Sequence, residues 1–306
     1  MAIPAPLPGR SAAARTGAAP TRRRTETTYY LFLVPALALF TLAITLPAVM
    51  GIVLSFTDSV GFGEHEFIGL TNYVALFSDP AILASYGFTA GFALVTVIVV
   101  NVVAFGLAVG LTGRIRAKVA MRTIFVLPMV VSGIIIAYVF NFLFSNSLPR
   151  LASAVGFAPL EQSILANPDL AWVAVVVVTA WQAIPSAMLI YIAGILAIPG
   201  EVYEAASIDG ASPGRQLRSI TLPLVAGYVL INLVIGFKNF LNAYDIIVGL
   251  TNGGPGTATR SVAMTIFSGF TGGDYAYQMA NATLFFLVAL ALALLQLRLT
   301  RGKVSV

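Results

Sequence analysis

The chain has 306 residues, of which 58% are hydrophobic and 9% are charged, and its formal net charge is +5. A soluble globular protein has about 25% charged residues, so this composition excludes a soluble fold and indicates an integral membrane protein. Because the chain has no cysteine and only one histidine, disulfides, thiolate metal sites and histidine-rich proton relays are also excluded.

Residues 1–25 are rich in alanine, proline and arginine, and we expect a disordered basic tail before a transmembrane domain at 26–306. Arg22, Arg23 and Arg24 precede an apolar run, which is also the pattern of a secretory or twin-arginine leader. The run is longer than the apolar region of a signal, and further apolar segments follow. We therefore interpret it as a retained first helix.

Six apolar intervals are long enough to cross a bilayer, because a spanning helix needs roughly 20 residues. The runs are continuous rather than alternating, which excludes barrel strands. The sequence therefore predicts an all-α integral membrane protein with six transmembrane helices. The expected spans are about 29–56, 86–112, 121–145, 170–196, 222–247 and 277–299.

The basic residues predict the orientation of these spans. Fourteen of the 17 lie before the first span, between the second and third, between the fourth and fifth, or after the sixth. Basic residues favour the cytoplasmic side, so both termini are expected there. Since these charges follow the membrane side instead of clustering on a soluble face, nucleic acid is not an expected partner.

A hydrophilic stretch at about 200–222 separates the fourth and fifth spans. Glu201 to Asp209 is typical of a short helix, and Gly210 suits a left-handed stop. Ser212 and Pro213 suit the start of a second short helix that runs to about Ile220. We expect Leu222 and Pro223 to lead the chain into the fifth span. The pattern predicts a helical hairpin on the cytoplasmic surface.

Polar residues inside apolar spans are energetically costly and mark candidate functional positions. Lys238, Asn242 and Asp245 have the i, i+4, i+7 spacing that places them on one helical face. Amides and aromatic rings suit a sugar or polyol, because amides pair with hydroxyl groups and rings cover C–H surfaces. For Asn101, Gln278 and Asn281 we favour hydrogen bonding between helices. The candidate substrate-pathway residues are Lys238, Asn239, Asn242, Tyr244, Asp245, Trp181, Gln182 and Asn141.

The hairpin carries a recognisable pattern: Glu-Ala-Ala, three residues, Gly, nine residues, Ile, one residue, Leu-Pro. It resembles the signature loop of permease subunits of binding-protein-dependent ABC importers. Residues 67–73, 122–128, 205–212 and 250–255 resemble the sugar-transporting branch, similar to maltose- and glycerol-phosphate-type permeases. The resemblance covers roughly residues 27–300. The matching positions of the hairpin are Glu204, Ala205, Ala206, Gly210, Ile220, Leu222 and Pro223.

The resemblance implies a type I ABC importer permease in the cell membrane of a prokaryote. The hairpin would be a coupling helix docked on an ATPase subunit, with Glu204 as its charged contact and Gly210 as its turn. The expected partners are a second homologous permease subunit, two ATPase subunits, an extracytoplasmic substrate-binding protein and membrane lipid. The chain would form half of the translocation path for a sugar or related polyol.

The chain has no phosphate-binding G-x-x-x-x-G-K-[ST] motif. We therefore expect ATP and Mg²⁺ on the ATPase subunits, with no cofactor, metal or covalent catalysis on this chain. Three alternatives stay open. An ABC permease for another small solute is possible, since Lys238 allows an anionic group. An ion-coupled secondary transporter would need inverted repeats and ion ligands. An intramembrane enzyme would need a nucleophile–base or metal constellation. Neither of these last two patterns is evident.

Overall fold

The computed structural model describes residues 27–113 and 117–300. The tail predicted at 1–25 lies outside these ranges, as do Arg114, Arg116, Arg301 and Lys303. Within them the regular elements are helices, and an isolated bridge joins Thr57 to Phe67. The all-α prediction is therefore confirmed for the described part of the chain.

The chain divides into two units, residues 1–49 and 50–306, and each is described by itself. The first unit contains α1 (Thr27–Phe40), the π-helical turn η1 (Thr41–Thr45) and the start of α2 (Leu46–Leu54). The run Tyr30–Leu54 is helical with a mean hydropathy of 2.4, which is long and apolar enough to cross a membrane. This agrees with the first predicted span.

In the second unit, three predicted spans are confirmed by helices of sufficient length and hydropathy. These are α4 (Pro80–Thr112), α8 (Pro168–Leu196) and α15 (Tyr275–Thr300). Two shorter helices come just before them in the chain. α3 (Thr71–Ser78) precedes α4, and α14 (Val262–Gly272) precedes α15. The 3₁₀ turns η4 (Ala158–Leu160) and η5 (Ile164–Ala166) lie between the third span and α8.

The bounds predicted for the third span, 121–145, are wrong. α5 (Lys118–Val126) ends in the 3₁₀ turn η2 (Leu127–Val130), because Pro128 has no N–H to continue the helical hydrogen bonds. The spanning helix is instead Gly133–Val155, built from α6 (Gly133–Phe142), η3 (Leu143–Ser147) and α7 (Leu148–Val155). Arg150, which lies after the predicted third span, is an exposed residue of α7.

The fifth predicted span is a bent pair of helical segments that meet at 63°. The first segment is α10 (Pro213–Gln216), η6 (Leu217–Thr221) and α11 (Leu222–Leu224), and the second is α12 (Ala226–Leu241). The bend lies at Val225, and Leu222 and Pro223, expected to lead into the span, belong to the segment before the bend. The N–H of Leu222 bonds to the carbonyl of Leu217, and this wider π turn accommodates the ring of Pro223.

A π turn also precedes two other prolines. The π turns η1, η3 and η6 are each followed directly by a Leu-Pro pair, at positions 46–47, 148–149 and 222–223. A π turn removes the close contact between a proline ring and the carbonyl four residues earlier. Proline therefore does not end these three helices, whereas α5 ends just before Leu127 and Pro128.

α12 ends at Leu241, and a separate short helix, α13 (Asp245–Thr251), follows. Asn242 has the backbone angles of a helix end, φ −92° and ψ 17°, and Tyr244 is not helical. The prediction that Lys238, Asn242 and Asp245 share one helical face is therefore wrong for Asp245, which belongs to α13.

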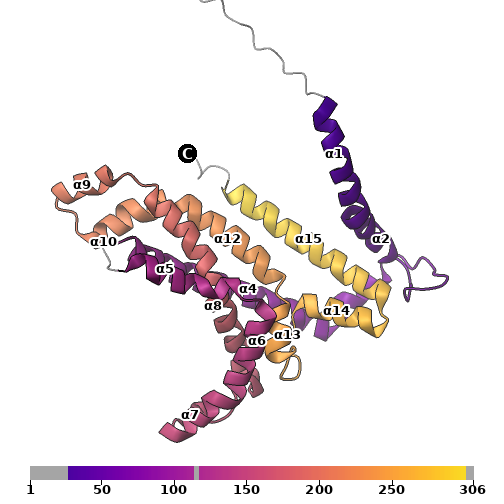
Figure 1. Cartoon of the computed structure of the whole chain (residues 1–306). Coiled ribbons are helices and arrows are strands. Elements are labelled where there is room, and N and C mark those ends of the chain that lie inside the picture. The colour runs from indigo at the N-terminus through magenta and orange to yellow at the C-terminus, as the bar shows by residue number, and fades with distance from the viewer. Residues whose placement is uncertain (1–26, 114–116, 301–306) are drawn as a thin grey trace, which may run out of the picture. The chain divides into compact units, whose positions relative to one another are not determined.

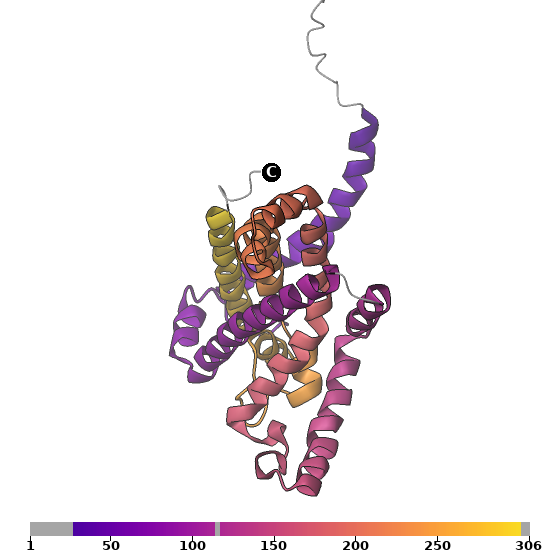
Figure 2. The same ribbon diagram turned by 90° about the vertical axis from the view of Figure 1, so that its left-hand side faces the viewer.

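α4, α8 and α12 pack together at the centre of the second unit (Figures 1 and 2). α4 buries Ala93, Ala104 and Ala108, and α8 buries Ala174 and Ala180. Such small side chains let membrane helices approach closely. α6 packs on α13, and α14 packs on α15. Both views show the hairpin of α9 (Gly200–Ile208) and α10, together with the C-terminal end of α15, on one side of this unit and α7 on the opposite side.

Candidate functional site

The corner of the hairpin is a left-handed helix stop. α9 ends at Ile208, and Gly210 has a φ of +77°. The N–H of Ala211 donates to the carbonyl of Ala206 at 2.9 Å, and the N–H of Gly210 donates to that of Ser207 at 3.1 Å. This pair of bonds is the Schellman motif, in which glycine avoids the steric cost of positive φ. The predicted roles of Gly210 and of Pro213 as the first helical residue are confirmed.

Side-chain hydrogen bonds hold the two arms of the hairpin together. The hydroxyl groups of Tyr203 and Thr221 lie 2.9 Å apart, and Thr221 is buried. Nε2 of Gln216 donates to Oγ of Ser207 at 3.0 Å and to the carbonyl of Ala211 at 3.1 Å. These bonds link α9 to the arm that leads, through the bend at Val225, into α12.

The signature residues of the hairpin point mainly outward. Glu204 and Ala205 are exposed on α9, and Leu222 and Pro223 are exposed on the second arm, whereas Ala206 and Ile220 are half-buried. Ile208, at the tip, is 86% exposed. Glu204 makes no side-chain hydrogen bond or ion pair with the described residues. The hairpin thus presents an unused carboxylate and apolar side chains, a surface suited to contact with another protein.

A groove of about 430 Å³, lined by both polar and apolar side chains, lies where α8, the end of α12 and the start of α13 meet. It contains five residues predicted for the substrate pathway, Gln182, Asn239, Asn242, Tyr244 and Asp245. The other lining residues are Met129, Gly133, Thr179, Ala183, Ser186, Phe240, Ala243 and Ile246. Residues separated by more than a hundred positions are therefore brought to one surface.

Some polar groups of the groove are fixed by backbone contacts. Nε2 of Gln182 donates to the carbonyl of Val131 at 2.9 Å, and Nδ2 of Asn242 donates to the carbonyl of Lys238 at 2.9 Å. The ring of Tyr244 packs edge-on against Phe267 of α14 with centroids 5.3 Å apart. The side-chain carbonyl oxygens of Gln182 and Asn242 make no hydrogen bond with the described residues and can accept one from a ligand.

Thr179 belongs to the groove although the sequence analysis missed it. It is 6% exposed, and its buried Oγ1 has no hydrogen-bond partner among the described residues. A buried hydroxyl without a partner costs about 1–3 kcal/mol, so a ligand hydroxyl would satisfy it. A sequence pattern could have identified Thr179. Thr179, Gln182 and Ser186 have the spacing i, i+3, i+7, which places them along one face of α8.

Three predicted pathway residues lie elsewhere. Lys238 is exposed and does not line the groove. Trp181 is 43% exposed and packs edge-on against Phe140 at 5.3 Å. Asn141 lines a separate cavity of about 520 Å³, and its Nδ2 donates to the carbonyl of Leu250 at 2.6 Å. The structure therefore does not bring these three side chains to the groove.

The seam between α6 and α13 positions one wall of the groove. Gly249 of α13 lies so close to α6 that a Cβ added there would be 2.7 Å from Cβ of Ala137. The hydrogen bond from Asn141 to Leu250 joins the same two helices. Asn141 thus acts as a link between helices, and the start of α13, with Asp245, is held beside α8.

Other intramembrane amides also join helices, as favoured from the sequence for Asn101 and Asn281, whereas Gln278 bonds to Asn281 within α15. The hydroxyl of Tyr191 donates to Oδ1 of Asn101 at 2.5 Å, and that of Tyr86 donates to Oδ1 of Asn281 at 3.0 Å. Asn232, which is buried, donates to the carbonyl of Ala187 at 3.1 Å. These bonds connect α4, α8, α12 and α15, and they explain polar residues that do not reach the groove.

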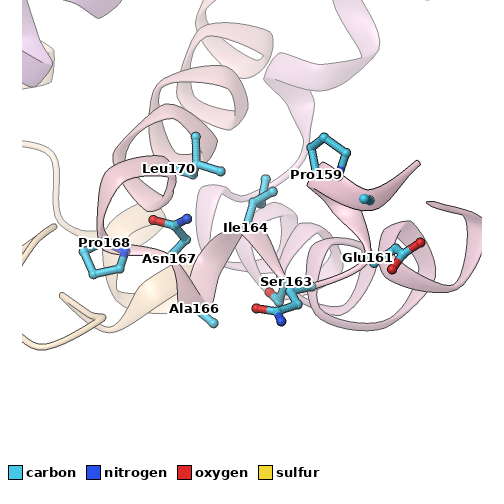
Figure 3. A pocket seen from close by; sticks show the side chains of 10 residues that line it. Pro159, Glu161, Ser163, Ile164, Ala166, Asn167, Pro168 and Leu170 are labelled. Carbon is cyan, nitrogen blue, oxygen red and sulfur yellow. The ribbon is translucent and has the colours of Figure 1, made fainter. Parts of the chain in front are cut away.

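A shallow cavity of about 420 Å³ lies over the turns η4 and η5, between α7 and α8 (Figure 3). Two polar side chains of this cavity already accept hydrogen bonds from backbone N–H groups. Oγ of Ser163 accepts from the N–H of Leu165 at 3.2 Å, and Oδ1 of Asn167 accepts from the N–H of Asp169 at 2.8 Å. The latter bond caps α8. This cavity therefore has a structural explanation.

Comparisons with known proteins agree with this architecture. A family model described as a binding-protein-dependent transport system inner membrane component matches residues 102–301. The chain is 34% identical over 276 residues to the probable starch degradation products transport system permease protein AmyD of Thermoanaerobacterium thermosulfurigenes, covering 90% of this chain and 94% of that protein. It is 32% identical over 278 residues to the trehalose/maltose transport system permease protein MalF of Thermococcus litoralis, with coverage of 90% and 94%.

A solved structure also resembles the chain. A bacterial alginate ABC transporter, in complex with alginate pentasaccharide-bound periplasmic protein, contains a chain that superposes with a TM-score of 0.78 at 22% identity. The match covers 90% of this chain and 94% of the other. At this identity the likeness concerns the fold alone.

Proposed function

The chain belongs to the family of binding-protein-dependent transport system inner membrane components, and from this premise we propose that it is a permease subunit of an ATP-driven importer for a neutral sugar or related polyol. It pairs with a second homologous permease, two ATPase subunits and an external substrate-binding protein. ATP and Mg²⁺ bind the ATPase subunits, and this chain performs no covalent chemistry. It lies in a prokaryotic cell membrane with both termini in the cytoplasm.

The observation that carries the solute class is the composition of the groove. Gln182, Asn239, Asn242 and Thr179 offer amide and hydroxyl groups, which pair with the hydroxyls of a sugar. The ring of Tyr244 can cover a C–H face of the same solute. The names of the relatives, which concern starch degradation products and trehalose or maltose, support a saccharide as well.

The charges beside the groove argue against an anionic solute. Asp245 lines the groove, whereas Lys238, the only basic residue of α12, does not. A carboxylate without a neighbouring cation repels a carboxylate or phosphate group of a ligand. A permease for a strongly anionic solute is therefore the weaker proposal.

Coupling to the ATPase follows from the hairpin. ATP favours closed ATPase subunits, and a hairpin docked on them transmits that closure to the membrane helices. Glu204 and the exposed apolar residues around it supply the docking surface. The bonds Tyr203–Thr221 and Gln216–Ser207 join this surface to the arm that leads into α12, whose far end lines the groove.

The test is uptake by the complete transporter in proteoliposomes. Wild-type uptake should require ATP and the binding protein and should survive collapse of the ion gradient. Glu204→Lys should abolish uptake while the protein still inserts, because it reverses the charge of the docking surface. Glu201→Lys, the same change at another exposed residue of α9, is the matched control. Uptake that follows the ion gradient instead of ATP contradicts the transporter class, and normal uptake by Glu204→Lys contradicts the role of the hairpin.

A further inference from the structure

A second polar cavity lies at the opposite end of the molecule from the hairpin, where α4 and α15 begin. It has a volume of about 310 Å³, at the lower end of the range of about 300–1,000 Å³ for small-molecule sites. Under the proposed orientation this end faces the outside of the cell, so the inference below rests on the proposed function. The lining residues are Asp79, Ala81, Ile82, Arg260, Thr265, Ser268, Gly269, Gly272, Asp274, Tyr277 and Gln278.

Two charged residues of this cavity are held in place by the protein itself. Oδ1 of Asp79 accepts from the N–H of Ala81 at 2.8 Å, which caps α4, and its Oδ2 accepts from the hydroxyl of Tyr277 at 3.1 Å. The guanidinium of Arg260 donates to Oγ of Ser268. The walls of the cavity are therefore ordered before any ligand binds, which lowers the entropic cost of binding.

Two other groups of the cavity are unused. Gln278 is 4% exposed, and its Oε1 accepts from Nδ2 of Asn281 at 3.2 Å, but its Nε2 makes no hydrogen bond with the described residues. Asp274 is exposed at the mouth, and its carboxylate likewise has no hydrogen bond or ion pair within residues 27–113 and 117–300. The Nε2 atom is not enclosed by the protein, so water or a ligand group in the cavity can accept a hydrogen bond from it.

The unused donor and the unused acceptor share one cavity, which restricts the kind of ligand. A cation could pair with Asp274 but could not accept from Gln278. The lining carries two carboxylates, Asp79 and Asp274, against one guanidinium, Arg260, so its net negative charge disfavours an anion. A hydroxyl group both donates and accepts, so vicinal hydroxyls satisfy both residues at once. The ring of Tyr277 adds an apolar surface for sugar C–H groups.

We propose that this cavity is an outer sugar subsite, in which Gln278 donates to one hydroxyl of a sugar unit and Asp274 accepts from a neighbouring one. α14 separates this subsite from the groove. Ser268 lines the cavity, and the adjacent Phe267 packs on Tyr244 of the groove. A solute released by the binding protein can therefore contact the subsite before it reaches the groove.

Binding of maltose and, separately, trehalose to the complete transporter, measured by saturation-transfer difference NMR without the binding protein, tests this subsite. Asp274→Ala and Gln278→Leu should each weaken the binding of at least one of the two sugars by about tenfold, the effect of losing a hydrogen bond to a charged or buried group. Asp274→Ala is informative even if Gln278→Leu misfolds, because the Asp274 side chain is exposed and bonds to no described residue. Glu161→Ala, another exposed acidic residue on the same side, is the matched control and should leave binding unchanged.

The inference is wrong if folded Asp274→Ala binds both sugars as the wild type does, or if the wild type binds neither of them. It is also wrong if Glu161→Ala weakens binding as much as Asp274→Ala, because the effect would then be one of general surface charge. ATP-dependent uptake by the wild type is measured in parallel. Normal uptake together with an unchanged Asp274→Ala variant contradicts only the subsite, whereas absent uptake contradicts the proposed function.

Discussion

The hydrogen bonds that shape the hairpin join residues no more than 18 positions apart, whereas the groove gathers residues from positions 129 to 246. The hairpin is built from local signals, namely a helix stop at Gly210 and a proline start at Pro213. The groove exists only after α8, α12 and α13 have packed. The two regions should therefore respond differently to substitution, with the hairpin tolerant of changes in packing and the groove sensitive to them.

The largest expected effect is on packing next to the groove. Gly249→Val places a side chain where a Cβ would lie 2.7 Å from Cβ of Ala137, and such overpacking costs about 1–3 kcal/mol or more. We expect a lower membrane yield and a lower thermal midpoint of the purified complex. Gly227→Val in α12, where nothing lies within 4 Å, is the control. Equal stability of the two variants contradicts the proposed role of the α6–α13 seam.

The second prediction distinguishes the function of the hairpin from that of the groove. Proline cannot adopt the φ of +77° found at Gly210, so Gly210→Pro breaks the corner at a local cost of about 1–3 kcal/mol. Uptake should be lost, while solute binding to the permease complex stays close to normal because the groove is distant. Gly214→Ala in α10, which has open space around it, should transport normally. Solute binding that disappears together with uptake in Gly210→Pro indicates global misfolding and removes the distinction between the two regions.

A smaller effect is expected within the groove. Thr179→Val keeps the shape of the side chain but removes the unpartnered Oγ1. The thermal midpoint should stay the same or rise, because a buried polar atom without a partner is removed, at a gain of about 1 kcal/mol. The KM for uptake should rise several-fold if a solute hydroxyl binds there. A lower midpoint with an unchanged KM would show that Thr179 has a structural role only.

The smallest effect is expected at Lys238. Its side chain is exposed and lies outside the groove, so Lys238→Gln should change the KM for uptake by less than about twofold, as is usual for a surface substitution. Asn239→Leu, at the adjacent position that does line the groove, should raise the KM more. If Lys238→Gln has the stronger effect, the groove is not the solute path, and an anionic solute becomes the better proposal.

Most spans could be predicted from composition. The first, second, fourth and sixth are confirmed because long apolar stretches without charge have no other stable environment than the membrane. The third was misplaced because Leu127 and Pro128 continue the apolar run while ending the helix. The fifth, predicted at 222–247, is instead a pair of segments within 213–241 that meet at 63° at Val225.

In the candidate sites, too, features set by single residues were predictable, whereas features set by helix packing were not. Gly210 and Pro213 were predictable, because positive φ and a missing N–H are properties of single residues. Gln182, Asn239, Asn242, Tyr244 and Asp245 were predicted as polar residues in apolar spans, and they do meet. Asn141 was selected by the same criterion, but it links α6 to α13 instead. Polarity alone does not distinguish a ligand contact from a bond between helices.

Apolar length, charge distribution and turn residues by themselves determined the membrane class, most of the spans and the hairpin, because each of these depends on a few neighbouring residues and their solvent. The tertiary structure alone decided which polar side chains line the groove, that Thr179 has an unpartnered hydroxyl there, and that Gln278 and Asp274 share a second cavity. These features depend on how helices far apart in the chain pack, and that packing sets which polar atoms keep a partner within the protein.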